Sequence, residues 1–251
     1  MSEFKFPTEM VELPSKGLLY PESSPLASGK IEMKYMTAKE EDILTNSNYI
    51  KQGVVIDKLL QSMIISKINF NDLLVCDKDA ILMAARVLGY GKDYQIRYPN
   101  PNTGEYEDVM VDLTKLKEKV LDESLLLTPK TNELSFTLPN TLNIITFKLL
   151  TQADEANIDT ELKGLKKIDP NSNPEMTTRL KYMILSVNGS SDKKTVRDFV
   201  DNGLLARDSR ALREYVNKIS PGIDMKYSHT FSDGVEEDII VPIGVDFFWP
   251  E

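Results

Sequence analysis

The sequence predicts an α+β protein built from two tandem, duplicated units, and three observations on its 251 residues support this. Several segments have apolar residues at helical spacing, others read as short strands closed by turn residues, and both kinds recur in the same order. Each predicted unit consists of strands, then helices, then a β-hairpin. We expect the two units to pack about a pseudo-twofold axis.

The first recurring feature is a strand-like segment that leads into a helix start. "KYMTAKEEDI" from Lys34 matches "KLLTQADEANI" from Lys148, and each has a threonine followed three residues later by an acid. Thr37 with Glu40 and Thr151 with Asp154 are typical of a helix N-terminus, where the hydroxyl caps free amides and the carboxylate suits the positive helix end.

The second recurring feature is a pair of amphipathic helices in each unit. "VVIDKLLQSMIIS" matches "MTTRLKYMILSV", and Asn173 followed by Pro174 predicts the N-cap and first turn of the latter. "KDAILMAARVLGYGKDYQIRY" then matches "RDSRALREYVNKISPGIDMKY" without a gap, with Asp79 and Asp208 as the expected caps. The predicted apolar stripes are Ile56, Leu59, Leu60, Met63 and Ile64; Met176, Leu180, Met183, Ile184 and Val187; and Ala211, Leu212, Tyr215, Val216 and Ile219.

Each unit is expected to end in a hairpin, and the hairpins set the domain boundaries. Residues 1–115 form the N-terminal unit with its hairpin at 96–113, and residues 132–251 form the C-terminal unit with its hairpin at 224–243. Residues 116–131 are charged, then apolar, then end at Pro129, which is typical of a connector.

Composition excludes several classes of function. The net charge is −9 and lysine and arginine are dispersed among acidic residues, so nucleic acid is not an expected partner. The longest apolar runs are far shorter than the roughly 20 residues of a membrane helix, and the acidic, proline-broken start is unlike a signal peptide. With Cys76 as its only cysteine the chain has no internal disulfide, which indicates a protein of a reducing compartment.

The residues that most enzymes use for catalysis are scarce. His229, the single histidine, falls in the second hairpin without a recognisable triad, and Cys76 lies among apolar residues as a small hydrophobe. "GYGKD" lacks the spacing of a phosphate-binding loop, and the carboxylates read as helix-start and strand-edge charges. We therefore expect a non-enzymatic protein with no catalytic, cofactor-binding or metal-binding residues.

Two stretches have more apolar residues than loops usually carry. "ELPSKGLLYPESSPL" is interrupted by prolines and glycine, and "VDFFWPE" ends the chain in three aromatics. Each either packs on its own domain or docks on a partner, and removal of residues 247–251 is expected to weaken binding more than stability. The candidate partner-binding residues are Leu13, Pro14, Lys16, Gly17, Leu19, Tyr20, Phe247, Phe248, Trp249 and Pro250.

Six segments, taken in order, resemble the baseplate hub assembly proteins of T-even-type contractile-tailed phages. They are "ELPSKGLLYP", "MTAKEEDIL", "IDKLLQSMI", "DLLVCDKDAILMAARVLGYG", "DSRALREYVNKISP" and "DFFWP". The resemblance implies a late phage protein needed to build the central hub of the tail baseplate. Its expected partners are phage baseplate hub proteins, and its expected role is that of an assembly chaperone or a minor hub component. The resemblance further implies that it works in the host cell cytoplasm during assembly or lies in the virion tail baseplate.

The chain departs from this family at the two hairpin tips. Some relatives carry a Cys-x-x-Cys pair there, whereas "YPNPNTGEY" and "YSHTFSDGVEE" have no cysteine. We expect turn chemistry instead, with Asn102 bonding local amides, Gly104 at positive φ, and Asp233-Gly234 as a hairpin turn.

Two other functions stay open at this stage. One is a baseplate-associated hydrolase that uses carboxylates, and the other is a binding module built on degenerate zinc-ribbon hairpins. The particular hub partner, the stoichiometry and retention in the mature virion are not contained in the sequence.

Overall fold

The computed structural model describes residues 7–243 and 245–248, and the chain is an α+β protein. In the described part the strands form five small antiparallel sheets, of which four have two strands and one has three. The N-terminal half contains β1 Thr8–Glu12, β2 Lys30–Lys34, α1 Ala38–Leu44, α2 Ser47–Gln52, α3 Val55–Met63, α4 Val75–Tyr90, β3 Asp93–Pro99 and β4 Tyr106–Asp112, with short 3-10 turns at Pro25–Ser28 and Phe70–Asp72.

The connector and the C-terminal half follow. The connector holds β5 Lys117–Lys119 between 3-10 turns at Leu113–Lys115 and Glu123–Leu125. The C-terminal half contains β6 Leu134–Thr137, β7 Ile144–Phe147, α5 Gln152–Ile168, α6 Glu175–Met183, β8 Ile184–Val187, α7 Lys193–Asp198, a π-helical turn at Phe199–Gly203, α8 Ala206–Ile219, β9 Gly222–Asp224, β10 Lys226–Thr230, β11 Glu236–Ile240 and the 3-10 helix η6 Val245–Phe248.

Helices α1 and α5 begin at the predicted threonine–acid pairs, and both predictions are confirmed. The Thr37 amide and hydroxyl donate to Glu40 Oε2 at 3.0 and 2.6 Å, and the Thr151 amide and hydroxyl donate to Asp154 Oδ2 at 2.9 Å each. A lysine from the preceding segment completes each start, with Lys34 2.8 Å from Glu40 and Lys148 2.8 Å from Asp154. These matching contacts are what the predicted duplication requires, although duplication itself stays a prediction.

The matched helices α3 and α6 each have nine residues, and three details of the prediction for α6 are wrong. Ile184 and Val187 lie in β8, because the chain leaves the helix at Met183 and pairs with β7. The backbone of Pro174 flanks the first turn as N-cap, so Asn173 lies outside the helix. Met176 is half exposed, although its sulfur lies 4.0 Å from the hydroxyl of the buried Ser209, whereas Leu180 is fully in the core.

Helices α4 and α8 each carry a buried aspartate at their third residue, and the prediction that Asp79 and Asp208 cap these helices is wrong. The N-caps are Leu74 and Leu205, and the Asp208 carboxylate accepts hydrogen bonds from Asn140 and Thr141 instead of from its own helix. Helix α4 begins at Val75, so Asp77 holds the position in α4 that Asp208 holds in α8. Asp79 lies half a turn further in, where its carboxylate cannot reach the free amides. The predicted stripe of α8 does face the core, and Tyr215 stacks on Phe136 at 4.5 Å between ring centroids.

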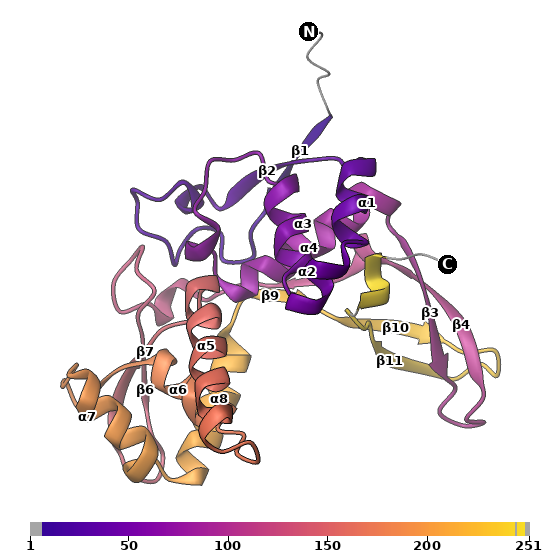
Figure 1. Cartoon of the computed structure of the whole chain (residues 1–251). Helices are drawn as coiled ribbons and strands as arrows, with labels where there is room; N and C mark the ends of the chain where they lie inside the picture. Colours follow the sequence, from indigo (N-terminus) through magenta and orange to yellow (C-terminus); the bar gives the residue numbers. More distant parts are fainter. Residues whose placement is uncertain (1–6, 244, 249–251) are drawn as a thin grey trace, which may run out of the picture.

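The C-terminal segment crosses back to the N-terminal half instead of closing on α5–α8 (Figure 1). Strand β9 pairs with β5 of the connector, hairpin β10–β11 lies beside hairpin β3–β4, and η6 packs on α4. The predicted hairpins are both present, but the second does not lie with the helices that precede it in sequence.

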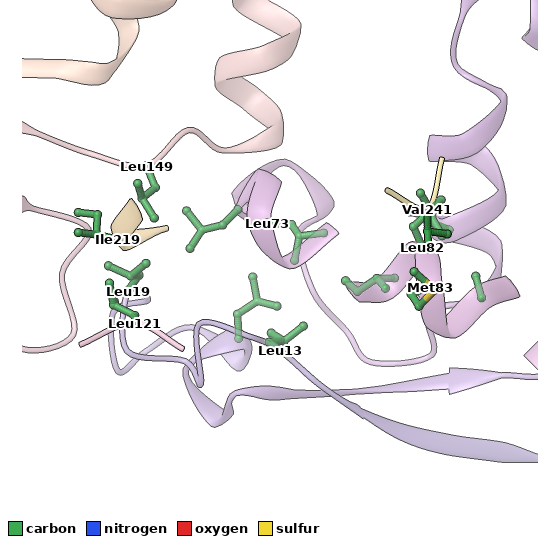
Figure 2. Packing of buried hydrophobic residues seen from close by; sticks show 14 of the residues in the cluster. Leu13, Leu19, Leu73, Leu82, Met83, Leu121, Leu149, Ile219 and Val241 are labelled. Carbon is green, nitrogen blue, oxygen red and sulfur yellow. The ribbon is translucent and has the colours of Figure 1, made fainter. Parts of the chain in front are cut away.

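One hydrophobic cluster runs through both halves. It includes Leu13 and Leu73 from the N-terminal half, Leu121 from the connector, and Leu149 and Ile219 from the C-terminal half (Figure 2). Figure 2 places Leu19 of the N-terminal arm in the same region as Leu121 and Ile219. The two halves therefore share a core, so surfaces on different halves are held in fixed positions relative to each other.

Candidate partner-binding surfaces

The N-terminal arm, residues 13–20, is fastened to the start of α4 by Asp77. Ser15 donates to Asp77 through its amide (2.9 Å to Oδ1) and its hydroxyl (2.7 Å to Oδ2), and the Tyr20 hydroxyl donates at 2.6 Å to Oδ2. The Leu74 amide in turn donates to the Tyr20 oxygen at 3.0 Å. Burial, reinforced by the adjacent Asp77 carboxylate, raises the pKa of Tyr20 and keeps this phenol a donor.

This geometry decides between the two alternatives for the arm, and the arm packs on its own protein. The side chain of Lys16 is partly exposed and pairs with Glu12 and Glu118 at 3.0 and 2.9 Å. The other arm candidates are buried and unavailable to a partner, which corrects their assignment as docking residues: Leu13, Pro14, Gly17, Leu19 and Tyr20. The prolines make this segment irregular, but the apolar side chains of the arm fill the shared core.

The C-terminal aromatics show a similar correction. Phe247 and Phe248 are fully buried, and the Phe247 ring contacts Tyr94 edge-on at 5.0 Å between centroids. Their loss would therefore remove core volume, so removal of residues 247–251 is expected to lower stability, while its effect on binding stays a prediction. Trp249 and Pro250 lie outside the described residues.

The tips of the two hairpins bind each other. Ser232 donates to Glu107 through its amide (3.0 Å) and its hydroxyl (2.8 Å), and Asn102 donates to Asp233 at 3.0 Å. Beneath these bonds, the rings of Tyr98 and Phe231 lie 6.5 Å apart. Two hairpins more than a hundred residues apart in sequence thus form one projecting body, which we call the hairpin pair (β3–β4 and β10–β11; Figure 1).

The turn chemistry at the tips differs from the prediction in one residue. Asn100 accepts from the amides of Asn102 and Thr103 at 2.9 and 3.3 Å, so Asn100 holds the turn while Asn102 reaches across to the other hairpin. Gly104 and Gly234 adopt the expected positive φ, at 72° and 85°. Within residues 7–243 and 245–248 no group of three or more His, Cys, Asp or Glu side chains is placed to hold a metal ion.

A cavity of about 320 Å³ lies between the two halves, lined in part by α4, α6 and α8. Its carboxylates are Asp79 and Glu155, and Arg179 holds Glu155 through two hydrogen bonds of 2.7 and 2.8 Å. Burial raises the pKa of Asp79 and raises that of the Cys76 thiol well above its ordinary value. The thiol is therefore a poor nucleophile, and Glu155 is engaged in an ion pair.

The outer face of hairpin β3–β4 exposes large side chains that sequence reasoning passed over. Tyr106 is 63% exposed and Met110 is 55% exposed, on the same face of β4 with Asp108 between them. Arg97, opposite Asp108 on β3, lies 3.6 Å from that carboxylate and 6.0 Å from the centre of the Tyr106 ring. The alternation of side chains along β4 could have identified this face, because it places Tyr106 and Met110 on the side opposite the buried Val109 and Val111.

The comparisons with known proteins give one match. The sequence model for the T4 bacteriophage base plate protein family matches residues 8–249, nearly the whole chain. The chain belongs to this family. Neither the search of curated proteins nor the search of solved structures gave a match.

Membership makes the chain a phage baseplate component, for which other baseplate proteins are the natural partners. The virion tail is the location that a baseplate protein suggests. No helix in the described part of this baseplate protein has the length and apolar character to cross a membrane.

Proposed function

We propose that this baseplate protein is a non-enzymatic protein-interaction factor in assembly of the tail baseplate hub. The observation that carries the proposal is the family match over residues 8–249, together with the ordered resemblance of six segments to hub assembly proteins. The hairpin pair supports it, because a rigid projection held by its own hydrogen bonds is suited to contact a partner with little ordering cost.

The chemistry of the cavity agrees with a non-enzymatic role. Glu155 is neutralised by Arg179, and Cys76 is a protonated thiol at neutral pH, so neither is a ready base or nucleophile. Asp79, whose pKa burial raises, is the remaining carboxyl among the described lining residues, and the alternative of a carboxylate hydrolase depends on it. The role divides into an assembly chaperone that leaves and a minor subunit that stays.

Co-expression tests the proposal. The tagged chain is co-expressed with each hub protein of the same phage, captured by affinity, and the complex is sized. We expect a defined complex with one hub protein; a folded chain that captures none of them would contradict the proposal.

The fate of that complex distinguishes the two roles. When the complex is added to hub assembly reactions, a chaperone is released and is missing from mature particles. A minor subunit is retained and is detected in purified tails.

A further inference from the structure

We propose that the outer face of hairpin β3–β4 is the docking surface of this protein and that its occupant is a basic surface of another baseplate protein. The inference rests on the proposed function and specifies which surface performs it and what charge the partner carries. It stands on three observations: an uncovered sheet face, its exposed apolar side chains, and the distribution of charge along the chain.

Of the two sides of sheet β3–β4, the described residues leave one uncovered. The inner side of β3–β4 is buried, with Tyr94, Ile96, Val109 and Val111 in the core. On the outer side the register places Pro99 opposite Tyr106 and Gln95 opposite Met110. A two-stranded sheet with one packed face gains further stability by covering the other, and exposed tyrosine and methionine are enriched at protein interfaces.

The hairpin is held rigid before any partner arrives. Glu107 accepts from Asn100 at 2.8 Å and from the Ser232 amide and hydroxyl, which joins the two tips. These hydrogen bonds, first that of Asn100 and then those of Ser232, lower the pKa of Glu107 and keep it ionised. A preformed face loses little conformational entropy on docking.

The charge of the chain is concentrated on this body and selects the partner. Residues 93–112 contain five acidic residues and one basic residue, and residues 226–240 contain four acidic residues and one basic residue. The hairpin pair therefore has a net charge of −7, and the remainder of the chain, with a total of −9, has only −2. Such a field steers a positively charged protein surface to the hairpins and repels acidic ones.

Nucleic acid is not an occupant of this face, because its phosphates would meet the same negative field. A second copy of the chain would place the two hairpin pairs, both of charge −7, against each other. A basic protein surface with an apolar centre satisfies both the charge and the exposed Tyr106 and Met110.

The test uses the full chain and the purified baseplate proteins of the same phage, probed singly for affinity at about 50 mM and about 500 mM salt. The first variant, Tyr106→Thr with Met110→Thr, removes the apolar side chains and keeps strand-forming residues. The second, Glu105→Gln with Glu237→Gln and Asp238→Asn, removes three exposed charges and spares the residues that join the tips.

Each variant has a matched control elsewhere on the surface. Ile50→Thr with Ile168→Thr removes two exposed apolar side chains from α2 and α5, and Glu22→Gln with Glu41→Gln and Asp42→Asn removes three exposed carboxylates from the N-terminal half. Circular dichroism and the melting temperature verify that every variant is folded.

We expect the hairpin variants to bind at least tenfold more weakly at low salt and the controls to bind within about twofold of the parent protein. The loss in the charge variant should shrink at high salt, because exposed charges are then screened. If the parent binds a baseplate protein and the hairpin variants bind it equally well, this docking surface is wrong and the proposed function stands. If the parent binds none of the baseplate proteins, the proposed function fails and the docking surface fails with it.

Discussion

At the residue scale, Gly17 shows how one backbone conformation fixes the N-terminal arm. It has φ +74°, and a Cβ at this position would lie 2.4 Å from the Ala27 carbonyl oxygen. Any side chain therefore requires both a disfavoured φ and a shift of backbone in the loop that closes over it.

We predict that Gly17→Ala lowers the free energy of unfolding by roughly 3 kcal/mol or more, because strain in φ of about 1 kcal/mol is added to a backbone clash. Urea unfolding followed by circular dichroism measures the change. Gly53 is the matched control, with φ +70° and open space around its Cβ, so Gly53→Ala should cost only about 1 kcal/mol. Equal losses at the two positions would show that the clash at Gly17 relaxes without cost.

The residue scale is also where local prediction reached its limit. The pairs Thr37–Glu40 and Thr151–Asp154 were predictable because each cap bonds within four residues. Asp77 and Asp79 were not distinguishable in sequence, since the choice depends on Ser15 and Tyr20, which bond Asp77 from across the fold. Long-range partners select between residues that look equivalent locally.

At the element scale, the start of α1 is anchored by a buried acid whose ionisation stabilises the fold. Burial alone would raise the pKa of Glu40, but hydrogen bonds from Lys34, Ser62 and Thr37 outweigh it and hold this pKa at about 2, below its usual 4.5. Because the pKa is lower in the folded protein, the contribution to stability is present above about pH 4.5 and is lost as the pH falls towards 2.

We predict that Glu40→Gln destabilises the protein at pH 7 by about 1–2 kcal/mol, after allowance for solvent screening. The difference in unfolding free energy between parent and variant should shrink as the pH falls from about 4.5 to about 2. Denaturant titrations at several pH values measure this. The exposed neighbour Glu41, changed to Gln, is the control at pH 7 and should give only a small difference. A difference for Glu40→Gln that does not change with pH would contradict the assignment.

Helix η6 gives the second prediction at this scale. Because Phe247 and Phe248 are buried against Tyr94 and α4, a chain ending at residue 246 should lose about 3–5 kcal/mol or more of stability. A chain ending at residue 248 keeps both rings and is the control, with a melting temperature close to that of the full chain. A common small effect of both truncations would show that the rings contribute little.

The sequence predicts which segments form helices and strands better than it predicts what those elements pack against. Alternation and turn residues gave both hairpins, and helical spacing gave the core faces of α3 and α8, because these patterns are written within a single segment. The sequence does not decide whether the arm and the terminal aromatics pack on their own core or dock on a partner. An apolar loop residue is compatible with both. The docking face was missed for the same reason: only the fold shows that Tyr106 and Met110 remain uncovered.

At the scale of the whole molecule, the predicted boundary at residue 115 does not coincide with a gap in packing. Lys130 donates to the carbonyls of Gly17 and Ala27, β5 pairs with β9, and Glu107 bonds Ser232. The hydrophobic cluster that contains the core residues of the N-terminal half also contains Ile239, Val241, Phe247 and Phe248 from the C-terminal segment. Two units that are adjacent in sequence are therefore interdependent in space.

We predict that the full chain unfolds in one cooperative transition and that residues 1–115 alone do not fold. Lacking the C-terminal segment, that fragment would expose the apolar side of β3–β4 and the contact face of α4, which leaves too little buried surface to offset chain entropy. Far-ultraviolet circular dichroism and amide hydrogen exchange of the fragment measure this.

A shortened chain separates the contribution of the C-terminal segment from that of α5–α8. Lys119 and Gly222 are opposite each other in the β5–β9 ladder, so an Asn-Gly turn can join them and remove the residues between. This chain regains β10–β11 and η6 and should recover protected amides in β3 and β4, which the 1–115 fragment lacks. A folded 1–115 fragment with protected amides would instead mean that the N-terminal half is an independent domain and that it does not need the C-terminal segment to fold.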